Sequence, residues 1–324
     1  MPEFPMLLVS ESEEANWPLL GRGWVCQERR LSTRVIHYAK DQILWECNST
    51  FRSTSDLDSP VHKPNAIRDV PNHEYLNWTR FIRLYSGMKF TKSGDRLPAL
   101  AGIVEREGRQ RKDDIYVAGT WKSTLLQELG FVGAINSSVV PGIPTWSWAY
   151  IRDSVWFWPI MHGTSTTTLT GLDFISDGAS NMGKVISASI RLKGPTLAVR
   201  ADIFSSYQSK VPILDNGIDE LLIQDKPFRI HEKIDPKAEL VLILMSASTD
   251  VSVSNQLGIN YGQCRLLILK EKLETKYERL SPLSLRYRRT DIQHSSPSIN
   301  DPKLVAQNME RLLALFTVRE VEII

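Results

Sequence analysis

Cysteine is scarce in this sequence of 324 residues: there are three, Cys26, Cys47 and Cys264, and none belongs to a CxxC pair. An odd number of widely spaced cysteines does not fit a disulfide framework, and a cysteine-rich zinc site needs ligands that are closer together. We therefore expect free thiols in a reducing compartment and no bound metal.

The sequence also lacks an excess of charge of either sign and any long apolar run. Its 39 basic and 37 acidic residues nearly cancel, which removes the attraction that drives nonspecific binding to nucleic acid or anionic lipid. No stretch approaches the ~20 apolar residues that span a bilayer. The apolar run near Met6 follows no basic residue and precedes an acidic stretch, unlike a signal peptide. These absences predict a cytoplasmic protein without nucleic-acid or membrane partners.

Several motifs that mark enzyme sites are missing as well. The sequence contains no GxGxxG, no GxxxxGKS/T, no HExxH and no GxSxG. Phosphate-cradling loops, zinc protease helices and the nucleophile elbow of hydrolases therefore have no support. We expect no cofactor.

What the sequence does have is the composition of a globular protein with many aromatic residues. Hydrophobic residues make up 42% of the chain, charged residues 23%, and there are nine tryptophans. This number of tryptophans favours a substantial core or an aromatic-lined cleft. The length fits one large or two modest domains.

Hydrophobic periodicity divides the chain into a helix-rich front and a β-rich back, which predicts an α+β fold. The expected units are residues 1–47, a helical region at 48–143 and a β-rich region at 144–324. Helices are expected at 23–31, 75–85, 95–105 and 114–129. Strands are expected at 6–9, 35–38, 43–45, 146–150, 155–158, 186–193, 197–203, 240–245, 266–270, 285–289 and 315–324. Ile186, Ala188, Ile190 and Leu192 are expected on one face of their strand, and surface loops at 48–72 and 163–183.

The stretch from Arg22 to Cys47 shows the clearest change of period. Trp24, Glu28 and Leu31 recur at helical spacing on one face, and two short alternating runs follow around a polar turn. We expect a helix that leads into a β-hairpin, with a carboxylate on the apolar face of the helix.

Five segments, in this order, resemble the fungal heterokaryon incompatibility (HET) family. The run RGWVCQERRLS resembles the last block of the HET domain, through Arg22, Gly23, Trp24, Gln27 and Glu28. The later segments that resemble the family are the W…YS helix at 78–86, DRLPALAG at 95–102, YVAGTW at 116–121 and PTWSWA at 144–149.

The resemblance implies a filamentous fungus, non-self recognition and regulated cell death after incompatible cell fusion. It also implies a domain similar to TIR-type α/β domains, some of which cleave NAD. The family's domain begins far upstream of the RGW block, whereas 21 residues precede Arg22 here. We therefore expect a truncated HET domain, present as its C-terminal helix and hairpin, then a small helical layer and a β-rich half.

Glu28 is the candidate catalytic residue. A carboxylate set against Trp24 and Leu31 would have a raised pKa, which suits general acid–base chemistry. The alternative is a structural ion pair with Arg22, Arg34 or another basic residue, and we favour it because most of the domain is absent.

A second candidate is an aromatic face on two strands. Trp146 and Trp148 alternate with small residues, and Trp156 and Trp158 follow across a turn. Such a face could stack a ligand ring, but aromatic residues at strand period more often form a sheet face packed under helices.

These observations lead to three functional hypotheses. The first is a non-catalytic HET-family protein that acts through contacts with other proteins, or is a decayed paralogue. The second is a TIR-like NAD glycohydrolase, completed by a partner chain or by missing exons. The third is a protein that binds a small ligand on the aromatic β face.

Overall fold

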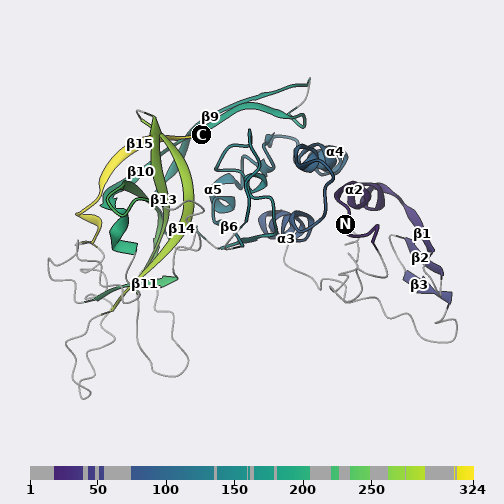
Figure 1. Ribbon diagram of the computed structural model, residues 1–324, viewed down its shortest axis with the longest axis horizontal. Helices are drawn as coiled ribbons and strands as arrows, with labels where there is room; N and C mark the ends of the chain where they lie inside the picture. Colours follow the sequence, from purple (N-terminus) through teal and green to yellow (C-terminus); the bar gives the residue numbers. More distant parts are fainter. Residues whose placement is uncertain are drawn as a thin grey trace, which may run out of the picture.

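The structure is a computed structural model of the 324-residue chain. It describes residues 18–38, 43–47, 51–54, 74–134, 137–158, 160, 164–178, 181–204, 220–225, 234–248, 262–273, 275–288, 310 and 312–324. The strand expected at 6–9 and most of the loop expected at 48–72 lie outside these residues. Figure 1 shows an elongated arrangement, with a helix and hairpin at one end, helices in the middle and a barrel at the other end.

The first described unit is a helix followed by a small antiparallel sheet, as the change of period predicts. Its elements are α2 (Gly23–Leu31), β1 (Arg34–Tyr38), β2 (Ile43–Cys47) and β3 (Phe51–Ser53), with the sheet in the order β1-β2-β3. Strand β3 falls inside the region that we expected to be a loop.

The face of α2 that we expected to be buried is the exposed one. Trp24 and Leu31 are each 39% exposed, and Glu28 between them is exposed as well. Helix α2 instead buries Gly23 and Cys26. The prediction was wrong because Gly23 and Cys26, the smallest residues of α2, form the side of the helix that packs closely against the next segment.

The middle of the molecule is a layer of short helices and two small two-stranded sheets (Figure 1). The helices are α3 (Glu74–Ser86), η2 (Ser93–Arg96), η3 (Pro98–Leu100), α4 (Ala101–Gly108), α5 (Leu125–Glu128) and η4 (Trp148–Tyr150). The first sheet is a hairpin of β4 (Tyr116–Val117) and β5 (Thr120–Trp121). The second pairs β6 (Phe131–Gly133) with β7 (Val155–Phe157).

The helix expected at 114–129 is not formed. A hairpin occupies its first half, and α5 has only four residues. Ala118 and Gly119 both have positive φ, of 45° and 98°. Two consecutive residues with positive φ form the tight turn that suits a two-residue hairpin and end any helix.

The strand expected at 146–150 is also absent. Residues Trp148–Tyr150 form a 3₁₀ turn, and the Ser147 side chain caps it by accepting a hydrogen bond from the Ala149 amide at 3.1 Å. The expected strand at 155–158 is present as β7, but its partner is β6.

The second half of the chain is rich in strands. They are β8 (Thr164–Ser165), β9 (Thr168–Ser176), β10 (Val185–Arg200), β11 (Glu220–Asp225), β12 (Glu239–Ser248), β13 (Gly262–Leu273), β14 (Lys276–Arg288) and β15 (Thr317–Ile323), with a 3₁₀ turn η5 (Ala201–Phe204). Strand β10 pairs with both β12 and β15, so that β10, β12, β13, β14 and β15 close into a barrel. The β14–β15 pair is parallel. The fold is thus α+β.

Three expectations for this half were wrong. The strands expected at 186–193 and 197–203 form a single strand, β10, and residues 201–204 form η5. The loop expected at 163–183 is largely strand, because β9 pairs along β10. Ile186 is 63% exposed, although we expected it on the buried face with Ile190 and Leu192. An irregularity in the β9–β10 register between Val185 and Ser187 shifts the side-chain alternation at this point.

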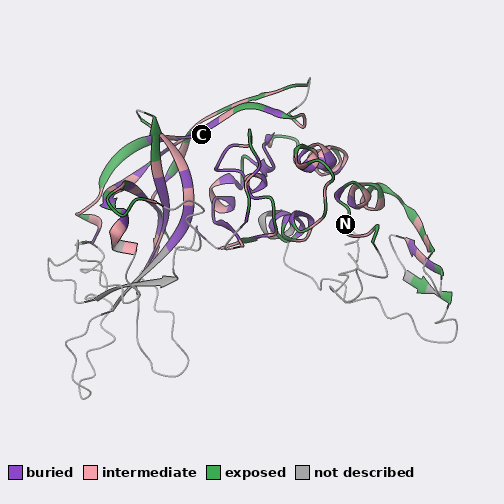
Figure 2. Ribbon diagram, viewed as in Figure 1, coloured by how far each residue is buried: buried purple, intermediate pink, exposed green. Residues whose placement is uncertain are grey.

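One hydrophobic core joins the helical layer to the strands of the barrel. It contains Ile82, Leu100 and Trp148 from the helical layer and Ile190, Ile243, Leu267 and Ile323 from the barrel. A second cluster lies on the opposite face of β12 and β13, where Leu312 packs against it. Figure 2 shows buried residues running through both the middle layer and the barrel strands.

Candidate functional site

The five segments that resemble the HET family meet one another in the helical layer. The first contact is between α2 and the segment after α3. The Gly23 amide donates to the Lys89 carbonyl at 3.1 Å, and the Lys89 amide donates to the Gly21 carbonyl at 2.7 Å. The Phe90 ring occupies the space that a side chain at residue 23 would need. Gly23 is therefore required for close approach.

Two side chains of α2 bind the segment DRLPALAG. The Trp24 indole N–H donates to Asp95 Oδ2 at 3.1 Å. The Gln27 side-chain oxygen accepts from the Gly102 amide at 2.9 Å. Because Gly102 lies in the first turn of α4, its amide has no partner within the helix, and Gln27 supplies one. Both residues thus have structural roles.

Glu28 has neither of the environments that we expected. Its carboxylate is exposed, away from an apolar surface, and it forms no ion pair with Arg22 or Arg34. Its carbonyl accepts hydrogen bonds from the Ser32 amide at 3.0 Å and the Ser32 hydroxyl at 2.8 Å, which end the helix. The family-like helix therefore presents this carboxylate to solvent.

The hairpin is tied to α2 by a buried carboxylate at another position. Glu46 accepts from both Arg29 Nε and Arg29 Nη2 at 2.8 Å, and its Oε2 lies 2.8 Å from His37 Nε2. Burial alone would raise the pKa of the Glu46 carboxyl, but hydrogen bonds from His37 and Arg29 outweigh it and leave the pKa below its ordinary value. The Arg29–Glu46 ion pair holds the hairpin to the helix, and His37 contacts the same carboxylate.

Cys26 is a buried thiol in α2. Burial raises its pKa to about 11, although Arg30 and Arg29 act in the opposite direction. The nucleophilic form of cysteine is the thiolate. At neutral pH Cys26 is therefore protonated, and it serves as a small apolar side chain.

The segment YVAGTW contributes the carbonyls of its turn. The Gly119 carbonyl accepts from the indole N–H of Trp148 at 2.7 Å and from that of Trp78 at 3.3 Å. The adjacent Ala118 carbonyl accepts from the Ser147 hydroxyl at 2.5 Å. Side chains of W…YS and PTWSWA thus bind the same turn.

The four tryptophans expected on an aromatic face do not form one. Trp146 and Trp148 are buried in the core, but residues 146–150 form no strand, so these side chains are not part of a sheet face. Trp156, on β7, is partly exposed, and Trp158 follows the end of that strand. Their backbones extend from different elements, and the two buried rings are inaccessible to a ligand.

The guanidinium of Arg96, in the segment DRLPALAG, donates hydrogen bonds to three backbone carbonyls. Its Nη1 donates to the Arg152 carbonyl at 2.6 Å, and its Nη2 donates to those of Ser86 at 2.9 Å and Asp153 at 3.0 Å. The Tyr85 hydroxyl in turn donates to the Arg96 carbonyl at 2.7 Å. These bonds connect α3, η2 and the turn before β7.

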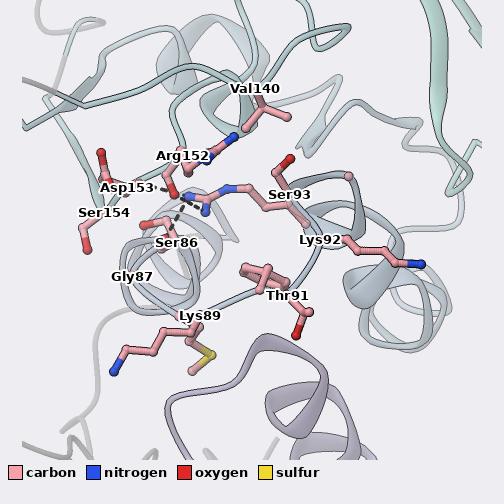
Figure 3. A pocket seen from close by; sticks show the side chains of 14 residues that line it. Ser86, Gly87, Lys89, Thr91, Lys92, Ser93, Val140, Arg152, Asp153 and Ser154 are labelled. Atoms are coloured by element: carbon pink, nitrogen blue, oxygen red, sulfur yellow. Dashed lines mark hydrogen bonds between the residues drawn. The ribbon is translucent and has the colours of Figure 1, made fainter.

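A cavity of about 710 Å³ lies beside these contacts. Figure 3 shows its lining side chains, with Lys89 and Lys92 extending from opposite edges and Arg152 beside Val140. Sequence reasoning missed this cavity because Arg152 comes from a segment separated from the lysines by the whole helical layer. The Asp95-Arg96 pair was the only feature beside the cavity that the sequence had singled out.

Glu128, in α5, was also missed. Burial raises the pKa of this carboxyl to about 8, despite hydrogen bonds from Thr124 and Thr120 and the positive charge of Arg111. Its Oε2 and the hydroxyl of nearby Tyr116 have no hydrogen-bond partner. Glu128 is buried, so its carboxyl group is not accessible to a ligand, and we assign it a role in the stability of the fold.

Within the part of the chain that the structure describes, no three His, Cys, Asp or Glu residues are grouped so that they could hold a metal ion. None of the described helices combines the length and apolarity required to traverse a bilayer. No family model, no curated protein and no solved structure matches the chain.

Proposed function

We propose that this protein is a non-catalytic relative of the fungal HET-family proteins, and that it acts inside the cell through protein contacts in non-self recognition. One observation carries the proposal. Several polar side chains of the family-like segments are bound to one another or to buried backbone groups, as those of Gln27, Trp148 and Arg96 are. Residues engaged in this way maintain a scaffold and are not available to a substrate.

The position of Glu28 supports the same proposal. Its carboxylate is exposed, and among the described residues it belongs to no group of three His, Cys, Asp or Glu that could hold a metal ion. General acid–base catalysis requires a group that is positioned against a substrate and has a matched pKa. Its exposed position leaves Glu28 without the enclosed surroundings that would position it against a substrate.

The exposed apolar side chains of α2 and the hairpin support the part of the proposal that concerns protein contacts. Six of the twelve exposed large hydrophobic side chains among the described residues lie between 19 and 43. They are Leu19, Trp24, Leu31, Ile36, Tyr38 and Ile43. Ile36, Tyr38 and Ile43 lie on one face of the hairpin, because Tyr38 pairs directly with Ile43. Exposed apolar clusters are typical of surfaces that bind proteins.

Incubation of the purified 324-residue chain with NAD tests the non-catalytic proposal. We expect no release of nicotinamide above the level of a buffer control, measured by chromatography over hours. Glu28→Ala is the informative variant, and Glu105→Ala removes an exposed carboxylate on α4 as a matched control. Release of nicotinamide that Glu28→Ala abolishes and Glu105→Ala leaves intact would overturn the proposal.

A further inference from the structure

The cavity beside Arg96 has the size and composition of a ligand site. Its volume of about 710 Å³ lies within the range of small-molecule pockets, roughly 300–1,000 Å³. It is lined by the end of α3, the chain leading into η2, and the turn that precedes β7. Met88, Phe90 and Val140 form its apolar wall, and Thr91, Ser93 and Ser154 contribute hydroxyl groups.

The charge of this lining is strongly positive. Besides Lys89, which has an interaction of its own, the lining contains the cationic side chains of Lys92, Arg96 and Arg152 and the carboxylate of Asp153, a net of +2. The chain as a whole carries a net charge of only +2. A concentration of positive charge at one concave surface raises the local concentration of anions.

Arg96 makes the positive charge a fixed part of the cavity. Its side chain is only 3% exposed, and no carboxylate of the described residues lies within ion-pair distance of it. Its partners are neutral carbonyls and the face of the Trp148 ring, 5.3 Å away. Burying a cation is costly, and the Asp153 carboxylate, which lies beyond ion-pair distance, offsets only part of that cost. An anion in the adjacent cavity would supply the missing negative charge.

The charge and the side-chain types of the cavity favour one class of anion. A net charge of +2 is best balanced by a ligand with more than one negative charge, and a phosphate monoester carries about −1.5 to −2 at neutral pH. Lysine, arginine and hydroxyl groups are the side chains that bind phosphate oxygens. We propose that this cavity binds a small phosphorylated molecule, with its phosphate beside Arg152 and next to the buried charge of Arg96.

Binding of inorganic phosphate and of pyrophosphate, each titrated at constant ionic strength, tests the proposal. The readouts are the heat of binding and the shift of the thermal unfolding midpoint. The variant Lys92→Gln with Arg152→Gln removes two exposed charges of the cavity and leaves the Arg152 carbonyl, which Arg96 binds, in place. The control Lys112→Gln with Lys122→Gln removes two exposed charges elsewhere.

We expect saturable binding of pyrophosphate to the native chain, tighter than that of inorganic phosphate. The cavity variant should bind pyrophosphate about tenfold or more weakly, and the control variant within about twofold of the native chain. Unchanged unfolding midpoints without ligand would show that both variants are folded. The absence of saturable binding, or equal weakening in both variants, would overturn the proposal.

Discussion

Replacing Arg279 by leucine is expected to lower the free energy of unfolding by about 3 kcal/mol, since each buried group left without a partner costs about 1–3 kcal/mol. Arg279 lies on β14 and is 5% exposed. Its Nε donates to the Leu129 carbonyl at 2.9 Å, its Nη2 donates to the Phe131 carbonyl, and its guanidinium lies 3.6 Å from the centre of the Phe131 ring. The substitution would leave both carbonyls buried and unpaired.

The effect is large because Arg279 connects the barrel to the helical layer. Its burial has a cost, visible as a pKa lowered to about 9, and leucine avoids this cost. The two orphaned carbonyls outweigh that gain. Chemical denaturation followed by tryptophan fluorescence measures the change. Arg319→Leu, at an exposed position of β15, is the control and should shift stability by no more than about 0.5 kcal/mol. Equal effects of the two substitutions would contradict the assigned role of Arg279.

Replacing Glu128 by glutamine is expected to stabilise the protein increasingly as the pH rises. The pKa of Glu128 is about 8 in the folded chain, chiefly because of burial, and 4.5 is its ordinary value. Between these values the unfolded chain has released the proton while the folded chain retains it. Raising the pH therefore lowers the stability of the native protein in this window, by about 1 kcal/mol per pH unit. Glutamine keeps the shape and removes the titration.

The difference in unfolding free energy between Glu128→Gln and the native chain should grow by a few kcal/mol between about pH 5 and about pH 8. Denaturation curves at several pH values measure it. Glu105→Gln, at an exposed site, should show no such trend. A difference that does not change with pH would mean that Glu128 titrates normally in the folded chain.

The elements with a clear period could be predicted from the sequence. Helix α2, the hairpin of β1 and β2, helix α3 and the strands β12, β13 and β15 have local patterns that the folded chain preserves, whereas β14 was expected only at 285–289 and runs from Lys276 to Arg288. The closure of the barrel could not be predicted, because the parallel β14–β15 pair and the β10–β15 pair join distant segments. Local patterns carry no information on such pairings.

The failures arose where a local pattern competed with a contact made elsewhere. Trp121, Leu125 and Leu129 recur at helical spacing, yet Ala118 and Gly119 turn the chain into a hairpin. The carbonyls of that turn are bound by side chains from α3 and from residues 147–148. Only Gly119 gave a local signal of positive φ.

The candidate sites were predicted less well than the fold. Glu28 was chosen for an apolar face that proved to be exposed, because Gly23 and Cys26 form the packed side of α2. The cavity depends on Arg96 and Arg152, which belong to separate segments and meet only in the folded chain. Their juxtaposition is a property of the fold.

The claim that the family-like segments form one scaffold is tested most directly by a double-mutant cycle of Trp78→Phe and Trp148→Phe. Both indoles donate to the Gly119 carbonyl. Either single variant leaves this carbonyl one donor, and the double variant leaves none. We predict that the double variant loses about 1 kcal/mol more unfolding free energy than the sum of the single variants. Trp78→Phe combined with Trp146→Phe, whose indole N–H has no partner, should be additive. Additive losses in the first pair would contradict the scaffold.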